Sequence, residues 1–395
     1  MKGSAMRLTD CYRLEDFRKL ARKRLPAPIF HYIDGGSDDE STLRRNSSAF
    51  DDVDLVPSVL AGVDSVDLSV EVLGARLKMP LFFAPTAMQR LFHHEGERAI
   101  ARVADEFRTM FGVSTVGTRS IEELGALTDA PKFFQIYVHK DPALTTNLIE
   151  RCRAARFNAL ALTVDTIVAG NRERDYHTGM TTPPKLNLRG LLSFATHPGW
   201  SMNYLLRERF DLPNVSEFIA EGSSAAMSVV DYINTQMKRS IDWDDAAAMI
   251  EEWGGPFAIK GVMSVADARR SVEIGASAIM ISNHGGRQLD GSRAPFDQLA
   301  AILDEVGGEI EVILDGGIRR GTHVLKALAM GATACSGGRM YLYALAAGGY
   351  AGVERAMSLM RGELERDMLL MGCRSIAELN PSCLAFRSSG PASPW

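Results

Sequence analysis

Residues 278–290 read Ala-Ile-Met-Ile-Ser-Asn-His-Gly-Gly-Arg-Gln-Leu-Asp, and this stretch shows how the chain is built. An apolar run, residues 278–281, stops abruptly at polar residues, as a buried parallel strand does where it meets a surface. His284 exchanges a proton near neutral pH, and Arg287 holds a carboxylate through two parallel hydrogen bonds. An anionic substrate that must lose a proton would suit this pair.

Similar apolar runs recur along the chain and alternate with amphipathic helical stretches. The runs are residues 81–84, 110–114, 133–138, 160–165, 257–260, 279–282, 312–315 and 334–338. The helical stretches include residues 95–106, 120–127, 144–155, 264–274, 296–305 and 322–330. Apolar strands that alternate with helices predict a parallel sheet covered on its outside. Eight such units favour an α/β fold of the (β/α)8 TIM-barrel type.

Nearly every run ends in a side chain capable of chemistry. These residues are Thr86, Ser114, Gln135, Tyr137, Thr163, Asp165, Lys260, Ser282, His284, Asp315, Gly338 and Arg339. In a barrel all strand ends meet at one face, where active sites lie. In an open doubly wound sheet they would spread along a line, so the pattern favours the barrel.

We expect a single domain over residues 1–395, with the barrel in residues 81–375 and two segments outside it. Residues 1–80 form an N-terminal helical segment, with a helix at 14–24. Residues 176–240 are too long for an ordinary loop after the fourth strand and predict an inserted lid. The apolar residues of this insertion, such as 191–194 and 204–206, leave contact with a membrane or a partner open.

Composition excludes several classes of protein. A hydrophobic fraction of 46%, a charged fraction of 24% and a net charge of −5 are those of a soluble globular protein and argue against nucleic-acid binding. The five cysteines show no metal-ligand spacing and fit reduced thiols in the cytoplasm. No signal peptide is evident, and no run approaches the roughly 20 apolar residues of a membrane-spanning helix. Peripheral contact with the inner face of a membrane stays open, and no metal site is expected.

Two glycine loops follow the seventh and eighth strands. They are residues 315–319 (Asp-Gly-Gly-Ile-Arg) and residues 337–339 (Gly-Gly-Arg). Barrels commonly hold phosphate at this place through backbone N–H groups, and arginine adds charge-assisted bonds. Either loop alone could be a plain tight turn, but the two together favour a phosphorylated cofactor. A nicotinamide site of Rossmann type is unsupported, because no GxGxxG follows a first strand.

Taken together, these motifs resemble the FMN-dependent α-hydroxy-acid oxidases and dehydrogenases, the family of glycolate oxidase, L-lactate dehydrogenase and mandelate dehydrogenase. The resemblance spans roughly residues 12–384. Its most specific element is SNHGGRQLD at 282–290. Further matches, in family order, are residues 85–88, 135–137, 162–165, Arg172 with Asp175, residues 259–261 and residues 314–321.

The resemblance implies the roles of the catalytic and substrate-binding residues. His284 would act as the base, Asp165 would orient its imidazole, and Tyr137 would meet the substrate oxygen. Arg172 and Arg287 would contact the substrate carboxylate, with His284 and Tyr137 also touching the substrate. Tyr32, which by itself is better interpreted as an ordinary core tyrosine, would reach the same carboxylate.

The resemblance also implies an FMN site. Its residues would be Pro85, Thr86, Ala87, Ser114, Gln135, Thr163, Lys260, Ser282, Asp315, Gly316, Gly317, Arg319, Gly338 and Arg339. Lys260 would stabilise the anionic reduced flavin. The implied reaction is the FMN-dependent oxidation of an L-2-hydroxy acid to the 2-oxo acid, with electrons passing to oxygen, a quinone or a cytochrome. A homotetramer is also implied.

Several alternatives stay open. L-lactate is the leading substrate, but the modest size of Val116 and Ala169 leaves mandelate or glycolate open. Ala87 lies where the family choice between Ala and Gly is linked to oxygen reactivity. The rivals are a different FMN barrel enzyme, inosine-monophosphate-dehydrogenase-like or isoprenoid-isomerase-like, and a barrel without enzymatic activity that binds a metabolite.

Overall fold

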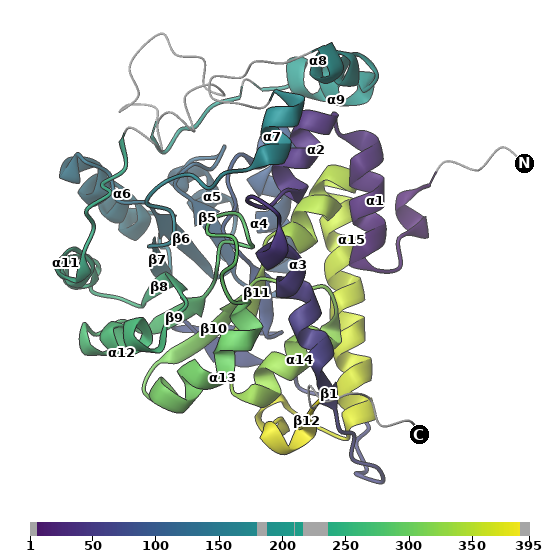
Figure 1. Cartoon of the computed structure of the whole chain (residues 1–395), viewed down its shortest axis with the longest axis vertical. Coiled ribbons are helices and arrows are strands. Elements are labelled where there is room, and N and C mark those ends of the chain that lie inside the picture. Colours follow the sequence, from purple (N-terminus) through teal and green to yellow (C-terminus); the bar gives the residue numbers. More distant parts are fainter. Residues whose placement is uncertain (1–5, 180–187, 209, 216–235, 388–395) are drawn as a thin grey trace, which may run out of the picture.

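The computed structural model describes residues 6–179, 188–208, 210–215 and 236–387. Within these residues, eight parallel strands close into a barrel in the order β10-β11-β4-β5-β6-β7-β8-β9 (Figure 1). The strands are β4 (Leu81–Phe83), β5 (Phe111–Ser114), β6 (Lys132–Ile136), β7 (Ala159–Thr163), β8 (Phe257–Val262), β9 (Ala278–Ile281), β10 (Glu311–Asp315) and β11 (Ala334–Gly337). Each corresponds to one of the sequence-predicted runs, which confirms the (β/α)8 barrel.

Helices cover the outside of the barrel. They are α4 (Glu97–Phe107), α5 (Ile121–Leu127), α6 (Pro142–Ala154), α11 (Trp243–Trp253), α12 (Val265–Glu273), α13 (Pro295–Val306), α14 (Gly321–Met330) and α15 (Arg339–Met371). Side-chain caps explain where several of them begin: the Ser120 hydroxyl accepts the backbone N–H of Glu123, and the Ser264 hydroxyl accepts that of Asp267. The six predicted helices are confirmed to within a few residues, whereas α11 and α15 were not predicted.

Helix α15 is interrupted at Gly348 and Gly349, where the backbone leaves helical geometry. Gly349 adopts a φ of +58°, and a Cβ there would lie within 2.4 Å of the His93 ring. The carboxylate of Glu95 accepts the backbone N–H of Tyr350 at 2.8 Å. An acidic side chain therefore satisfies the N-terminus of the second half of the helix.

A hairpin fills the amino end of the barrel. It consists of β2 (Val70–Val72) and β3 (Ala75–Leu77), joined by a two-residue turn at Leu73 and Gly74 in which both φ angles are positive. Val72, Leu73 and Leu77 are fully buried in one cluster with side chains from the barrel interior. The cavity described below lies at the opposite, carboxyl end.

The N-terminal segment up to residue 55 wraps the side of the barrel and ends beside the C-terminal strand. Its elements are η1 (Leu8–Asp10), α1 (Leu14–Arg24), α2 (Ala27–Asp34), α3 (Ser41–Ser48), η2 (Ala49–Asp52) and β1 (Val53–Leu55). Helix α1, with the predicted bounds, packs along α15. Strand β1 pairs antiparallel with β12 (Leu384–Phe386), which follows the short helices η5 (Ile376–Glu378) and η6 (Pro381–Cys383).

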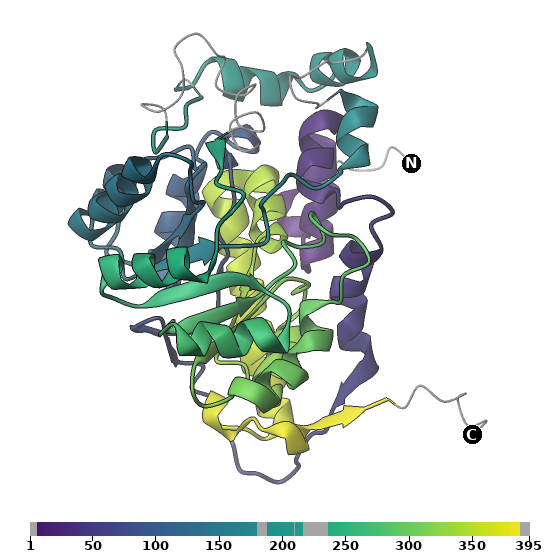
Figure 2. The ribbon, with the colours of Figure 1, turned by 60° about the vertical axis from the view of Figure 1, so that its left-hand side comes forward.

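The described helices of the insertion after β7 lie over the carboxyl end of the barrel, beside the N-terminal helices (Figures 1 and 2). These helices are α7 (Glu173–Thr178), α8 (Leu188–Ala195) and α9 (Pro198–Leu205), and both α7 and α8 contact α2. The parts of the predicted lid at 180–187, 209 and 216–235 lie outside the described residues. None of the described helices has the length and apolar content that crossing a membrane requires.

Candidate active site

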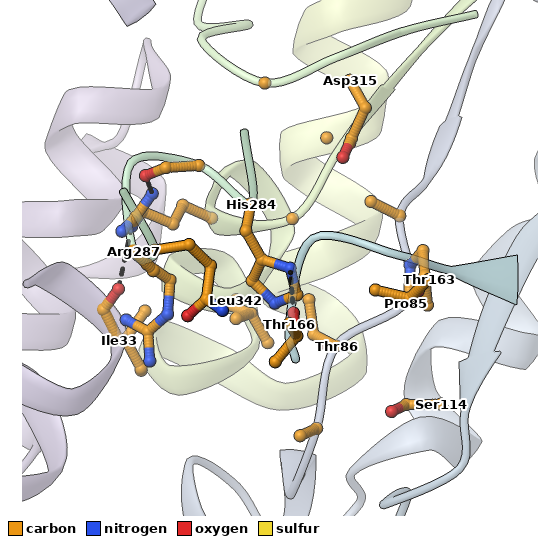
Figure 3. Close-up of a pocket in the computed structure, with 18 of the residues that line it drawn as sticks. Ile33, Pro85, Thr86, Ser114, Thr163, Thr166, His284, Arg287, Asp315 and Leu342 are labelled. Atoms are coloured by element: carbon orange, nitrogen blue, oxygen red, sulfur yellow. Dashed lines mark hydrogen bonds between the residues drawn. The ribbon is translucent and has the colours of Figure 1, made fainter. Parts of the chain in front are cut away.

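A cavity opens at the carboxyl ends of the barrel strands (Figure 3). The sequence-predicted residues that line it are Tyr32, Pro85, Thr86, Ala87, Ser114, Gln135, Tyr137, Thr163, Arg172, Lys260, His284, Arg287, Asp315, Gly316, Gly317, Arg319, Gly338 and Arg339. Asp165 and Ser282, the remaining two, lie directly behind it, hydrogen-bonded to residues that line it. The strand ends, together with Tyr32 from α2 and Arg172 before α7, therefore bring the whole predicted set together from distant parts of the sequence.

His284 is held from one side of its ring. Its Nδ1 lies 3.2 Å from the Thr166 hydroxyl (Figure 3). The same nitrogen lies 2.9 Å from the Asp165 carboxylate, which also accepts a hydrogen bond from the Thr166 hydroxyl at 2.9 Å. Burial alone would raise the pKa of Asp165, but the charge and hydrogen bond of His284 lower it below its ordinary value. The carboxylate is therefore ionised and only accepts hydrogen bonds.

This arrangement determines which nitrogen of His284 is free. Because the ionised Asp165 can only accept, the proton of the neutral imidazole resides on Nδ1. The lone pair of Nε2 is then available to take a proton. The backbone of His284 has a φ of +56°, and its N–H donates to the Ser282 hydroxyl at 3.1 Å. The ring is thus fixed by both its side chain and its backbone.

Two arginines flank Tyr32 at the same end of the cavity. The guanidinium carbons of Arg172 and Arg287 each lie 5.0 Å from the centre of the Tyr32 ring, within the range of cation–π contact. Burial, together with the charge of Arg172, lowers the pKa of Arg287 to about 10, so it remains a cation at neutral pH. One nitrogen of Arg287 donates to the carbonyls of Tyr32 and Gly35, at 2.6 and 3.0 Å. This end of the cavity suits a carboxylate.

A buried polar cluster lies at the other end. The ammonium of Lys260 is 3.1 Å from both the Asp315 carboxylate and the Ser282 hydroxyl. Ser282 and Ser336 donate to the two oxygens of Asp315, at 2.8 and 2.7 Å. Burial favours the neutral amine, but the charges of Asp315 and Asp165 leave the pKa of Lys260 above its ordinary value. A fixed positive charge therefore faces the cavity.

Two further side chains offer unused hydrogen-bonding groups. Gln135 Nε2 and Thr163 Oγ1 are buried and have no partner within the described residues, although both residues line the cavity. Ser114 donates to Gln135 Oε1 at 3.0 Å, which fixes the orientation of the amide. Buried polar atoms are rarely left unpaired, so these two atoms fit a polar ligand that the chain holds here.

The glycine loops at the ends of β10 and β11 complete this side. A Cβ on Gly317, which has a φ of +75°, would lie 1.9 Å from the Asn46 carbonyl, so only glycine allows the loop to lie against α3. Arg319 lines the cavity and donates to the adjacent Ile318 carbonyl at 2.8 Å. Arg339 donates to the carbonyls of Ile33, Gly285 and Gly35. Arg339 thus also ties the N-terminal segment to the barrel.

Several residues of the site were not predicted from the sequence. Thr166 directly follows Asp165 at a strand end, and this position could have identified it as a site residue. Phe92 and Leu342 line the cavity from segments whose patterns carry no such signal. Asn46 and Asn283 exchange two side-chain hydrogen bonds, at 2.8 and 2.7 Å, between α3 and the loop after β9.

Comparison with known proteins agrees with this geometry. The chain is 41% identical over 372 residues to an L-lactate dehydrogenase of Xanthomonas campestris pv. campestris, an alignment that covers 94% of this chain and 96% of that protein. Among solved structures, an (S)-mandelate dehydrogenase described as a monotopic membrane protein superposes with a TM-score of 0.90 at 33% identity, covering 95% of this chain and 100% of that one. A mandelate oxidase superposes with a TM-score of 0.80 at 33% identity, covering 95% and 98%.

The family model for FMN-dependent dehydrogenases matches residues 21–386, nearly the whole chain. The match includes all eight barrel strands and both glycine loops. FMN, the cofactor of this family, is a polar ligand of the kind that such unpaired atoms fit. The protein belongs to the FMN-dependent dehydrogenase family.

Proposed function

We propose that the protein oxidises an L-2-hydroxy acid, with L-lactate the first candidate, to the corresponding 2-oxo acid. The observation that carries this proposal is the convergence of a proton acceptor and two arginines at one end of the cavity. Nε2 of His284 is free while Nδ1 is bound to Asp165, and Arg287 and Arg172 flank the same space. A 2-hydroxy acid presents the matching groups: a carboxylate beside a carbon that bears both a hydroxyl and a hydrogen.

His284 acts as the base in this reaction. It takes a proton from the substrate, either from the α-carbon or from the hydroxyl, and the two electrons of the oxidation would pass to bound FMN. The imidazolium that results is stabilised by the ionised carboxylate of Asp165, 2.9 Å from Nδ1. Burial raises the pKa of Tyr137, so its hydroxyl stays protonated and can donate to the substrate oxygen.

Arg287 and Arg172 bind the substrate carboxylate, and Tyr32 lies between them. The guanidinium fork suits the two carboxylate oxygens. Arg172 Nε lies 2.9 Å from an Asp175 oxygen, a contact that orients this guanidinium. Because two cations share a mostly buried space, an anion between them relieves their mutual repulsion.

The residues at the opposite end would hold FMN, which when bound supplies a two-electron acceptor. Gln135 and Thr163 offer their unpaired atoms, with Ser114 and Ser282 beside them. Lys260 would supply positive charge to stabilise the negative charge of the reduced cofactor. The backbone of Pro85, Thr86 and Ala87 borders the same space. The loops of Asp315, Gly316, Gly317, Arg319, Gly338 and Arg339 would hold the phosphate end.

The test is an anaerobic bleaching experiment on the purified protein. L-lactate, glycolate, L-mandelate and D-lactate are added separately, and the loss of flavin absorbance is followed before air is admitted. We expect bleaching by L-lactate and none by D-lactate. Fast recolouring in air would identify oxygen as an acceptor, and slow recolouring would point to a quinone or cytochrome.

Other outcomes decide between the alternatives. Faster bleaching by mandelate or glycolate than by L-lactate would change the substrate. Bound FMN with no bleaching by any of the acids would contradict the proposal and favour a different FMN barrel enzyme. Purified protein that binds no flavin would favour a metabolite-binding barrel.

We also propose that the protein works in the cytoplasm, peripherally on the membrane through α8 and α9. Leu188, Leu191 and Leu192 of α8 and Leu205 of α9 are exposed, and a membrane provides a surface for such side chains. The monotopic (S)-mandelate dehydrogenase supports this proposal. Co-sedimentation with anionic lipid vesicles tests it, with a Leu191→Ser/Leu192→Ser variant expected to stay in the supernatant.

Light scattering would test whether the protein forms the expected homotetramer.

A further inference from the structure

Phe92 borders the end of the cavity that the two arginines occupy. Its side chain is only 3% exposed, yet it lines the cavity. Its ring centre lies 6.3 Å from that of Tyr32, with 27° between the ring planes. The Tyr32 ring is also the one that Arg172 and Arg287 flank. The Tyr32 ring therefore contacts Phe92 and also the two arginines that would bind the substrate carboxylate.

Phe92 is also the largest purely apolar side chain that lines the cavity. The cavity is also lined by the smaller apolar side chains of Ile33, Ala87, Val116, Ala169 and Leu342. The loops of Phe92 and Val116 are joined by a hydrogen bond of 3.1 Å from the Met88 N–H to the Val116 carbonyl. These residues form an apolar wall beside the charged groups.

The stereochemistry of a 2-hydroxy acid assigns a task to this wall. The α-carbon bears a carboxylate, a hydroxyl, a hydrogen and a side chain. The carboxylate belongs with the arginines, and the hydroxyl and hydrogen must be accessible to His284 and the flavin. The side chain is left with the apolar surface, and the volume that Phe92 leaves free limits its size.

The backbone of Phe92 is fixed by the insertion. Trp200 in α9 donates its indole N–H to the carbonyl of Leu91, the preceding residue, at 2.7 Å. The Trp200 ring is stacked on Tyr204, with 5.1 Å between ring centres and 10° between planes. The N–H of Phe92 donates to the Gln89 carbonyl at 3.0 Å, which closes the short helix η3 (Gln89–Leu91). Phe92 therefore cannot move outward unless α9 moves too.

We propose that Phe92 determines the size of the side chain that the substrate can carry on its α-carbon, and that Trp200 is the positioning residue that keeps Phe92 in place. This inference rests on the proposed function and deepens it. It favours small aliphatic 2-hydroxy acids over aryl ones, because a phenylalanine ring in the cavity wall leaves less volume for an aryl group than a smaller side chain would.

The experiment measures kcat/KM for L-lactate, L-2-hydroxybutyrate and L-mandelate in the wild type and in Phe92→Ala and Phe92→Leu. We expect Phe92→Ala to raise the mandelate-to-lactate ratio by roughly 10-fold or more, since one methylene in such a pocket changes discrimination by roughly 10–200-fold. Phe92→Leu should give an intermediate ratio. Calorimetric affinities for the unreactive 2-oxo acids pyruvate and phenylglyoxylate should change in the same direction.

Two control variants separate specificity from general weakening. Phe157→Ala removes a buried phenylalanine that does not line the cavity, so the ratio should stay at the wild-type value. Trp200→Phe keeps the aromatic ring but removes the N–H donor, and the ratio should shift in the same direction as in Phe92→Ala, by roughly 2–5-fold, within the range expected for one neutral hydrogen bond.

The two proposals fail in different ways. A wild-type protein that oxidises none of the acids would contradict the proposed function. A wild type that oxidises L-lactate, together with an unchanged ratio in both Phe92 variants, would overturn the role of Phe92 alone. A shifted ratio in the Phe92 variants without any shift in Trp200→Phe would remove Trp200 from the inference.

Discussion

The barrel side of the cavity and the side formed by residues 32–46 are built from different kinds of contact. On the barrel side, side chains bind side chains: Lys260 and Ser282 bind Asp315, and Asp165 binds His284. On the other side, the N-terminal segment contributes mainly backbone carbonyls. Those of Tyr32, Ile33 and Gly35 accept hydrogen bonds from Arg287 and Arg339.

This difference separates chemistry from positioning. The barrel supplies the groups that can take a proton or hold a charge, and these must be particular residue types. The N-terminal segment holds Arg287 and Arg339 in place through backbone carbonyls. Because every residue has a backbone carbonyl, these contacts do not require particular residue types. We therefore expect substitutions on the barrel side to affect turnover first, and substitutions in the N-terminal segment to affect stability first.

The largest expected effect follows replacement of His284. We choose His284→Asn, because asparagine tolerates the positive φ of this position better than most residues. Loss of the base should lower kcat by roughly 10²–10⁴-fold, while the protein keeps its flavin spectrum and folds normally. Stopped-flow reduction of the flavin by L-lactate checks this. Near-normal reduction would mean that another group takes the proton.

The next largest effect is expected in the N-terminal segment, at Asp34. This carboxylate is 4% exposed and accepts hydrogen bonds from Arg18, Arg174 and Tyr343, which join α1, α7 and α15. Asp34→Asn removes a buried carboxylate from two half-buried arginines that keep Glu15 and Glu40 as partners. The loss of unfolding free energy should therefore lie below that of a fully buried pair, at roughly 1–3 kcal/mol. Urea unfolding at pH 7 measures the loss. Asp39→Asn, at an exposed position of the same segment, is the matched control.

The same carboxylate predicts a pH dependence. Burial would raise the pKa of Asp34, but the hydrogen bonds from Arg18 and Tyr343 hold it well below its ordinary value of 3.8. A folded-state pKa below the unfolded one gives stabilisation that is complete above the unfolded pKa and lost as the pH falls through the folded one. The stability difference between wild type and Asp34→Asn should therefore narrow below about pH 4. A constant difference down to pH 3 would contradict this assignment.

The sequence alone predicts the barrel strands well, but not the contacts between segments that are far apart in the chain. The eight strands were predictable because strands buried on both faces consist of continuous apolar runs, and their polar ends marked the site. The pairing of β1 with β12, from opposite ends of the chain, leaves no local pattern. Helix α15 is interrupted by Gly348 and Gly349, which hides its length.

Some residues of the site could be predicted from the sequence and others could not. Lys260, Asp315 and His284 were predictable because a charged or polar residue at the end of an apolar strand is unusual. Asn46 and Phe92 were not, because a polar residue in a helix and an apolar residue in a loop are ordinary. Their importance comes from contacts with Asn283 and Tyr32, distant in the sequence.

A smaller effect is expected from Arg287→Lys. Lysine keeps the charge but cannot form the bidentate fork, and burial favours its neutral form. Losing one charge-assisted hydrogen bond should raise KM for L-lactate by roughly 10–150-fold, with a smaller effect on kcat. Steady-state kinetics measure both constants. Arg293→Lys, an exposed exchange six residues along the chain, should leave both constants unchanged. An unchanged KM in Arg287→Lys would reassign carboxylate binding to Arg172.

The smallest expected effect comes from Asn46→Ala, which tests the comparison itself. Asn283 would lose its partner in α3 but keep its bonds to the Arg293 carbonyl and the Gly286 N–H, each at 3.0 Å. The loss of unfolding free energy should therefore lie at the low end of about 1–3 kcal/mol. Ser48→Ala, exposed on the same helix, is the control. If α3 only positions the loop after β9, the melting temperature should fall while kcat changes by less than about 3-fold. Such a change is far smaller than the roughly 100-fold minimum loss of kcat expected for His284→Asn. A 100-fold fall in kcat at unchanged stability would mean that this side takes part in the chemistry, and the division between the two sides would not hold.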